Sequence, residues 1–274
     1  MTAVVQASTL RPGPLVSLWR YRDLIWRLGY REIIGQYKGS YLGVFWSLAN
    51  PLLLLAVYTF VFTKVFKARW IEGETTAEFA TALFVGLIVH GFFAECLNRA
   101  PGLVVGNPSY VTKVVFPLEI LPYPLTIAAL FHAFASLVIL LVARLLLTGT
   151  LPWTVVLFPI VFAPLVLMAI GFVWVLSALA VFVRDVSQTI AIITTALLFL
   201  SPVFYPLQSL PAYMQNAARF NPLTIPIEEA RKVLLWGQMP DWMALAGYTA
   251  VALLLCAVAF GLFQHSRKGF ADVL

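Results

Sequence analysis

The side chains of this sequence that could do chemistry are few, and most of them stand in apolar surroundings. Glu95 lies in an apolar run, between His90 on one side and Arg99, four residues further on, on the other. An ionisable residue inside a membrane helix is a candidate for proton or ion transfer. Glu followed by Arg at this spacing is also the favourable order for a structural ion pair on one helix face. We expect Glu95 to pair with Arg99 and His90 to lie on a different face.

The familiar motifs for catalysis and nucleotide binding are missing from the sequence. It has no G-x-x-x-x-G-K-[ST] phosphate loop, no H-E-x-x-H zinc motif and no G-x-S-x-G nucleophile motif. Cys96 and Cys256 stand far apart in apolar runs, where free cysteine usually packs as a small hydrophobic residue. The sequence therefore predicts that this chain is not an enzyme and holds no cofactor or metal.

The composition places these residues in a membrane protein. Of the 274 residues, 61% are hydrophobic and 11% are charged, whereas soluble domains are about 45–50% apolar and about 25% charged. The net charge of +6 comes from basic residues that flank the apolar runs. These bases favour contact with anionic lipid headgroups over nucleic acid.

The apolar runs predict membrane-spanning helices, each of which needs about 20 residues to cross a bilayer. We expect six spans in one all-α transmembrane domain over residues 1–274, with both termini in the cytoplasm because basic residues are more frequent on that side. The expected spans are Gly39–Thr63, Phe79–Asn98, Ile120–Ala143 with an extension to about Leu147, Thr154–Val183, Val186–Ser201 and Trp242–Gln264.

The segment before the first span predicts an amphipathic helix over residues 15–38. Its basic face carries Arg20, Arg27, Arg31 and Lys38, and its other face is largely apolar and aromatic. This pattern is typical of a helix that lies in the headgroup plane. The helix is either a simple anchor or a surface on which a partner docks.

A short cytoplasmic segment over residues 107–116 predicts one or two helical turns. Asn107 and Pro108 favour a helix start, and the Phe116-Pro117 pair favours its end. Such a segment, with Tyr110 and Lys113 inside it, suits docking into another protein, and an inert loop is the alternative.

The longest stretch between spans, residues 202–241, is rich in proline but also in apolar residues. It predicts two short helices on the extracytoplasmic side, roughly Pro211–Arg219 and Ile225–Trp236. Aromatic residues gather near this stretch, and their faces could stack on sugar rings, although helix packing explains them as well. These aromatic residues are Tyr58, Phe62, Phe66, Phe199, Phe204 and Tyr205.

The run REIIGQYKGSYLGVFWSLAN, Arg31–Asn50, followed by Pro51, resembles the first-span signature of the permeases of polysaccharide-export ABC transporters of the ABC-2 type. The resemblance extends along the chain through Asn107–Pro122, Ser201–Pro206 and Asn221–Thr224. It implies a homodimer in the bacterial cytoplasmic (inner) membrane that exports a lipid-linked, O-antigen-like polysaccharide for lipopolysaccharide biosynthesis.

The resemblance also implies roles for particular segments. Two copies of a separate ATP-binding subunit would bind ATP and Mg²⁺ and dock on residues 107–116, and residues 202–241 would form the gate region. The coupling residues would be Arg20, Arg27, Arg31, Asn107, Pro108, Tyr110, Lys113 and Phe116, and the aromatic residues named above would line the channel.

Three other functions are possible. An exporter of the same fold could carry a drug or a lipid. A proton-coupled transporter would require ionisable groups near the bilayer midplane, where the sequence offers only His90 and His132. A membrane enzyme would require a nucleophile or an acid–base pair, and no such motif appears.

Overall fold

The computed structural model describes residues 13–61, 76–112 and 116–273 of the chain. Within these ranges every regular element is a helix, which confirms the predicted all-α fold. Cys96 and Cys256 are both buried and unbonded, as expected of small hydrophobic residues.

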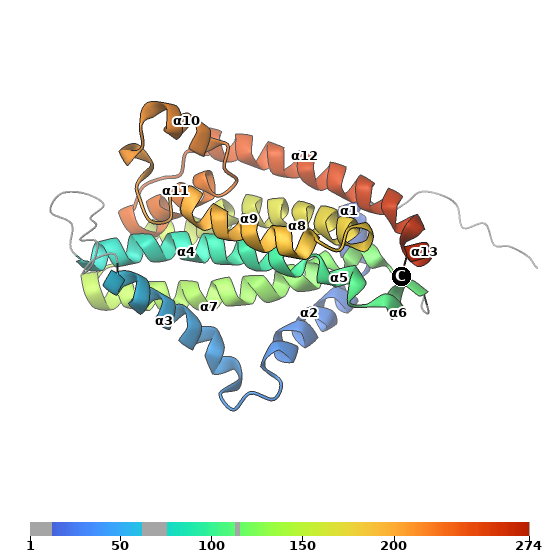
Figure 1. Ribbon diagram of the computed structural model, residues 1–274. Helices are drawn as coiled ribbons and strands as arrows, with labels where there is room; N and C mark the ends of the chain where they lie inside the picture. The colour runs from blue at the N-terminus through green and yellow to red at the C-terminus, as the bar shows by residue number, and fades with distance from the viewer. Residues whose placement is uncertain (1–12, 62–75, 113–115, 274) are drawn as a thin grey trace, which may run out of the picture.

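Long apolar helices form the body of the molecule and run alongside one another (Figure 1). Among the described residues, four helices are long and apolar enough to cross a membrane. They are α4 (Thr76–Arg99), α7 (Pro122–Thr148), α8 (Phe158–Phe182) and α12 (Trp242–Ser266). Two further apolar helices, α3 (Trp46–Phe60) and α9 (Val186–Leu200), occupy the predicted first and fifth spans but are shorter. The chain is therefore a helical membrane protein.

The first apolar helix begins later than predicted. Residues 39–42 form a turn, a 3-10 turn (Gly43–Phe45) follows, and α3 starts only at Trp46. Gly39 and Gly43 have φ values of +89° and +51°, which favour glycine and cannot continue a right-handed helix. The prediction of a span from Gly39 is wrong at this end, and its other end lies outside the described residues.

The amphipathic segment is two helices, α1 (Pro14–Arg20) and α2 (Arg22–Tyr37), because Tyr21 leaves the helical conformation. The expected single helix over residues 15–38 is therefore wrong. Together α2 and α3 form a V that points away from the bundle (Figure 1).

Short helices gather at the two ends of the bundle (Figure 1). One end carries α5 (Gly102–Val105), α6 (Pro108–Thr112), the 3-10 turns η3 (Leu118–Ile120) and η7 (Arg267–Gly269), and α13 (Phe270–Val273). The other end carries the turns η4 (Trp153–Leu157) and η5 (Leu207–Ser209), then α10 (Ala212–Arg219), α11 (Thr224–Arg231) and the π-helical turn η6 (Lys232–Trp236).

The two helices predicted in the segment over residues 202–241 are present, but one basic residue in them is not on the surface. Arg231 is fully buried. Its guanidinium donates to the carbonyl oxygens of Ala82 (3.0 Å), Pro202 (2.6 Å) and Val203 (3.0 Å) and to the Glu228 carboxylate (3.0 Å). Arg231 therefore fastens α11 to α4 and to the turn after α9.

Candidate functional site

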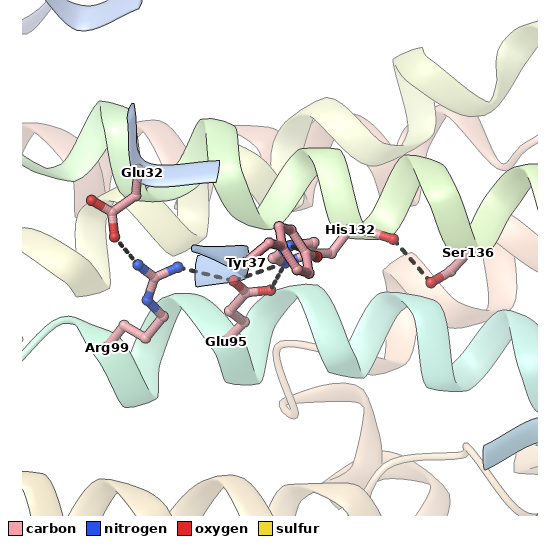
Figure 2. A network of polar contacts seen from close by, with 6 residues as sticks. All are labelled: Glu32, Tyr37, Glu95, Arg99, His132 and Ser136. Carbon is pink, nitrogen blue, oxygen red and sulfur yellow. Dashed lines mark hydrogen bonds and ion pairs between the residues drawn. The ribbon is translucent and has the colours of Figure 1, made fainter. Parts of the chain in front are cut away.

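A network of polar side chains joins α2, α4 and α7 (Figure 2). At its centre, Glu95 of α4 accepts hydrogen bonds from Arg99 Nη1 at 3.1 Å and from His132 Nδ1 of α7 at 2.8 Å. The other end nitrogen of Arg99 pairs with Glu32 of α2. The Tyr37 hydroxyl, at the end of α2, lies 2.9 Å from His132 Nε2. Arg99 and His132 therefore link two side chains of α2 to the single carboxylate of Glu95.

The hydrogen-bond directions in this network follow from the chemistry of its groups. Burial raises the pKa of the Tyr37 phenol above its usual value, so the hydroxyl keeps its proton and can donate to Nε2 of His132. The Glu95 carboxylate can only accept, so Nδ1 of His132 donates to it. The Ser136 hydroxyl donates to the His132 carbonyl at 2.9 Å, which is a contact within α7.

The predicted pair of Glu95 and Arg99 is confirmed, but the rest of the network was missed. His132 stands alone in its apolar run, and Glu32 and Tyr37 belong to a different helix. The separation of 95 residues between Tyr37 and His132 leaves no local spacing to detect.

A pocket of about 600 Å³ opens beside the network, under the V of α2 and α3. Glu95 and His132 form part of its wall. The remaining wall is polar on the side of α2 and the start of α3 and apolar along α4. It is formed by Gln36, Tyr37, Ser40, Trp46, Ser47, Asn50, Pro51, Leu54, Phe84, Leu87, Ile88, Gly91, Phe92, Ala129, Ala133 and Ser136.

Part of the predicted coupling set comes together at the end of the bundle. Arg31 Nη2 of α2 donates to the Tyr110 hydroxyl of α6 at 3.0 Å. The Tyr110 ring stacks on Phe116 with centroids 4.5 Å apart. The Asn107 side chain donates to the Leu103 carbonyl of α5, and Pro108 begins α6.

Other members of this set are not joined to it. Arg20 and Arg27 are exposed, and within the described ranges no hydrogen bond links either of them to α6. Lys113 lies outside the described residues.

The predicted channel aromatics also meet in part. Phe204 lies between Tyr58 of α3 and Phe199 of α9, with centroids 5.5 Å from each. The Tyr205 hydroxyl donates to the Leu200 carbonyl at 3.0 Å. Phe204 is 9% exposed whereas Phe199 is 60% exposed, so part of the group packs and part faces outward. Phe62 and Phe66 lie outside the described residues.

The long apolar helices and the short helices at the ends of the bundle define a helical membrane protein. In it, the amphipathic helix α2 contacts the short helix α6 at one end of the bundle. Comparison with known families gives the particular class: the chain belongs to the ABC-2 type transporter family, whose model matches residues 23–235. The matched range includes the polar network, the pocket and the predicted coupling segment.

Curated relatives match the chain over nearly its whole length. It is 28% identical over 260 residues to the O-antigen export system permease protein RfbA of Myxococcus xanthus, covering 93% of this chain and 96% of the relative. It is 23% identical over 255 residues to the protein of the same name from Klebsiella pneumoniae, covering 92% and 95%.

Proposed function

We propose that this chain is the channel-forming permease subunit of an ATP-driven exporter that moves a lipid-linked, O-antigen-like polysaccharide across the bacterial cytoplasmic membrane. The observation that carries the proposal is the match to O-antigen export permeases over more than nine-tenths of both chains. An exporter of the same type for a drug or a lipid is the alternative.

In this proposal α3 and α9 cross the membrane together with the four longer helices. Six crossings return the chain to its starting side, so both termini lie on one side of the membrane with α5, α6 and α13, and this side is the cytoplasm. The basic residues near α1, α2 and η7 support this orientation.

The proposed assembly is a homodimer with two ATP-binding subunits, which bind ATP and Mg²⁺. The exposed apolar faces of α3 and α9 support contact with a second copy or with lipid, since they offer Leu52, Leu53, Val57, Phe60, Ile192, Ile193 and Leu200. The ATP-binding subunit would dock on α6 and the basic side of α2, where Arg31 and Tyr110 meet.

The polysaccharide would leave through a channel lined by the aromatic residues near the outer ends of α3 and α9. Aromatic faces stack on sugar rings without a fixed hydrogen-bond register, which suits a sliding polymer. Phe199 is the most exposed of these aromatic residues among those that the structure describes and is therefore the best candidate for contact with the polysaccharide in transit.

The first test measures polysaccharide on the surface of cells that depend on this chain. Cells without the chain should lack the polymer, and Tyr58→Ala should reduce it because the Tyr58–Phe204 contact shapes the exit. Membrane abundance of the variant must be measured beside export, since truncation of a packed aromatic ring costs about 3–5 kcal/mol in soluble cores. Reduced export at normal abundance supports the channel, and normal export at normal abundance removes Tyr58 from it. Unchanged surface polymer in cells without the chain would instead favour the drug or lipid alternative.

The second test concerns the docking surface. Tyr110→Cys places a thiol on a half-buried position of α6, and a cross-linker should join it to the ATP-binding subunit. Val156→Cys, an exposed position at the other end of the bundle, is the matched control and should give no product. Labelling of the thiol in the Tyr110→Cys variant by an impermeant reagent added outside the cell would contradict both the topology and the docking surface.

A further inference from the structure

Helix α2 links two parts of the molecule that the proposed function requires to work together. Near its middle, Arg31 bonds to Tyr110 of α6 at 3.0 Å. Its end is joined to α3 by the turn over residues 39–42 and the 3-10 turn that follows. The place of α2 on the bundle therefore determines where both the predicted coupling segment and the first apolar helix lie.

Only a narrow stripe of α2 holds it to the bundle. Ile25 and Gly29 are buried, whereas Trp26 and Tyr30 are 68% and 61% exposed. The contact at Gly29 is close, because a Cβ atom there would lie 3.0 Å from Cγ2 of Ile127 on α7. Full burial of α2 against the bundle is therefore confined to the stripe around Ile25 and Gly29.

The polar network adds contacts in the half of α2 that leads to α3. Glu32 pairs with Arg99 and Tyr37 contacts His132, and both of these partners are oriented by Glu95. The side chains of Glu95, Arg99 and His132 are only 20–29% exposed, so water screens their interactions less than at an open surface. Without Glu95, Arg99 and His132 lose the acceptor that sets their positions for α2.

We propose that Glu95 is a positioning residue for ATP-driven export. Through Arg99 and His132 it keeps α2 docked on α4 and α7, and docked α2 keeps α6 and the start of α3 in the arrangement that export requires. This inference rests on the proposed function and adds a role for a residue outside the predicted coupling and channel sets.

The first arm of the test removes the carboxylate. Glu95→Ala should lower export per ATP hydrolysed by the complete transporter by roughly 2- to 30-fold, the range seen when coupling residues are changed, at unchanged membrane abundance. Asp23→Asn is the control, because it removes the charge of an acid on α2 whose side chain is 86% exposed. Export by this control should equal that of the unchanged protein.

The second arm strengthens the docking of α2 on α7 with a covalent bond at their closest approach. A Cβ atom built at Gly29 lies 3.3 Å from Cβ of Ile127, near the separation of about 3.5–4.5 Å found in disulfides. Gly29→Cys with Ile127→Cys should therefore form a disulfide between α2 and α7. The new cysteine at position 127 also removes the branches of isoleucine that crowd this site.

In the Glu95→Ala background, the oxidised disulfide should restore export, and a reductant should abolish the gain. Ile127→Cys alone should give no rescue. If the disulfide forms and export stays low, Glu95 acts by another route, such as proton transfer, and the inference is overturned. Failure of the disulfide to form in the otherwise unchanged protein contradicts the docked position of α2. A lack of polymer export by the unchanged protein would instead refute the proposed function itself.

Discussion

Replacing Arg231 with alanine is expected to destabilise the protein by about 3–5 kcal/mol, the usual cost of removing one partner from a buried ion pair. The side chain is fully buried and donates to three backbone carbonyls and to Glu228. Alanine removes this donor from the three carbonyls and takes the arginine partner away from the Glu228 carboxylate, in a site that water cannot easily reach. The melting temperature of the purified protein in detergent should fall by roughly 10 °C.

A conservative variant separates the geometry of Arg231 from its charge, and a variant at another arginine is the control. Arg231→Lys keeps the charge but cannot reach several carbonyls from one planar group, so its loss of stability should be intermediate. Arg219→Ala removes an exposed arginine from α10 and should change stability by no more than about 0.5 kcal/mol. A melting temperature of Arg231→Ala equal to that of the unchanged protein would show that α11 is held in some other way.

Replacing Trp174 with alanine is the second change with a large expected effect, again about 3–5 kcal/mol. Trp174 is fully buried in α8, and its ring packs edge-on against Tyr123 and Phe260 at 5.7 Å and 5.2 Å. Its indole N–H donates to the Glu119 carbonyl at 3.0 Å. The cavity left by alanine loses these dispersion contacts whether lipid or water surrounds the protein.

The loss of packing and of the hydrogen bond at Trp174 should also loosen the predicted coupling end of the bundle, because Glu119 belongs to η3 between α6 and α7. Thermal unfolding and membrane abundance measure the effect. Trp174→Phe keeps a ring but removes the donor, and should cost less than alanine. Trp153→Ala, at a position that is 67% exposed, is the control. Equal melting temperatures for the Trp174→Ala and Trp153→Ala variants would contradict the packing role.

The sequence by itself determined the class of the protein and most of its helices. Long runs without charge can satisfy their backbone groups in a bilayer only as helices or closed barrels, and the runs found at α4, α7, α8 and α12 confirm this prediction. Local signals also predicted several helix ends: the second short helix in the segment over residues 202–241 ends at Trp236, before Gly237, whose φ is +65°. The pair of Glu95 and Arg99 was predictable because its spacing lies within one helix.

Only the tertiary structure decided which polar residues meet. It brought Glu32 and Tyr37 of α2 and His132 of α7 together around Glu95 and Arg99 of α4, and it buried Arg231. It also divided the N-terminal amphipathic segment at Tyr21 and delayed the first apolar helix to Trp46. These outcomes depend on how helices that are distant in sequence cross one another, and a local pattern of apolar and charged residues does not specify which faces come into contact.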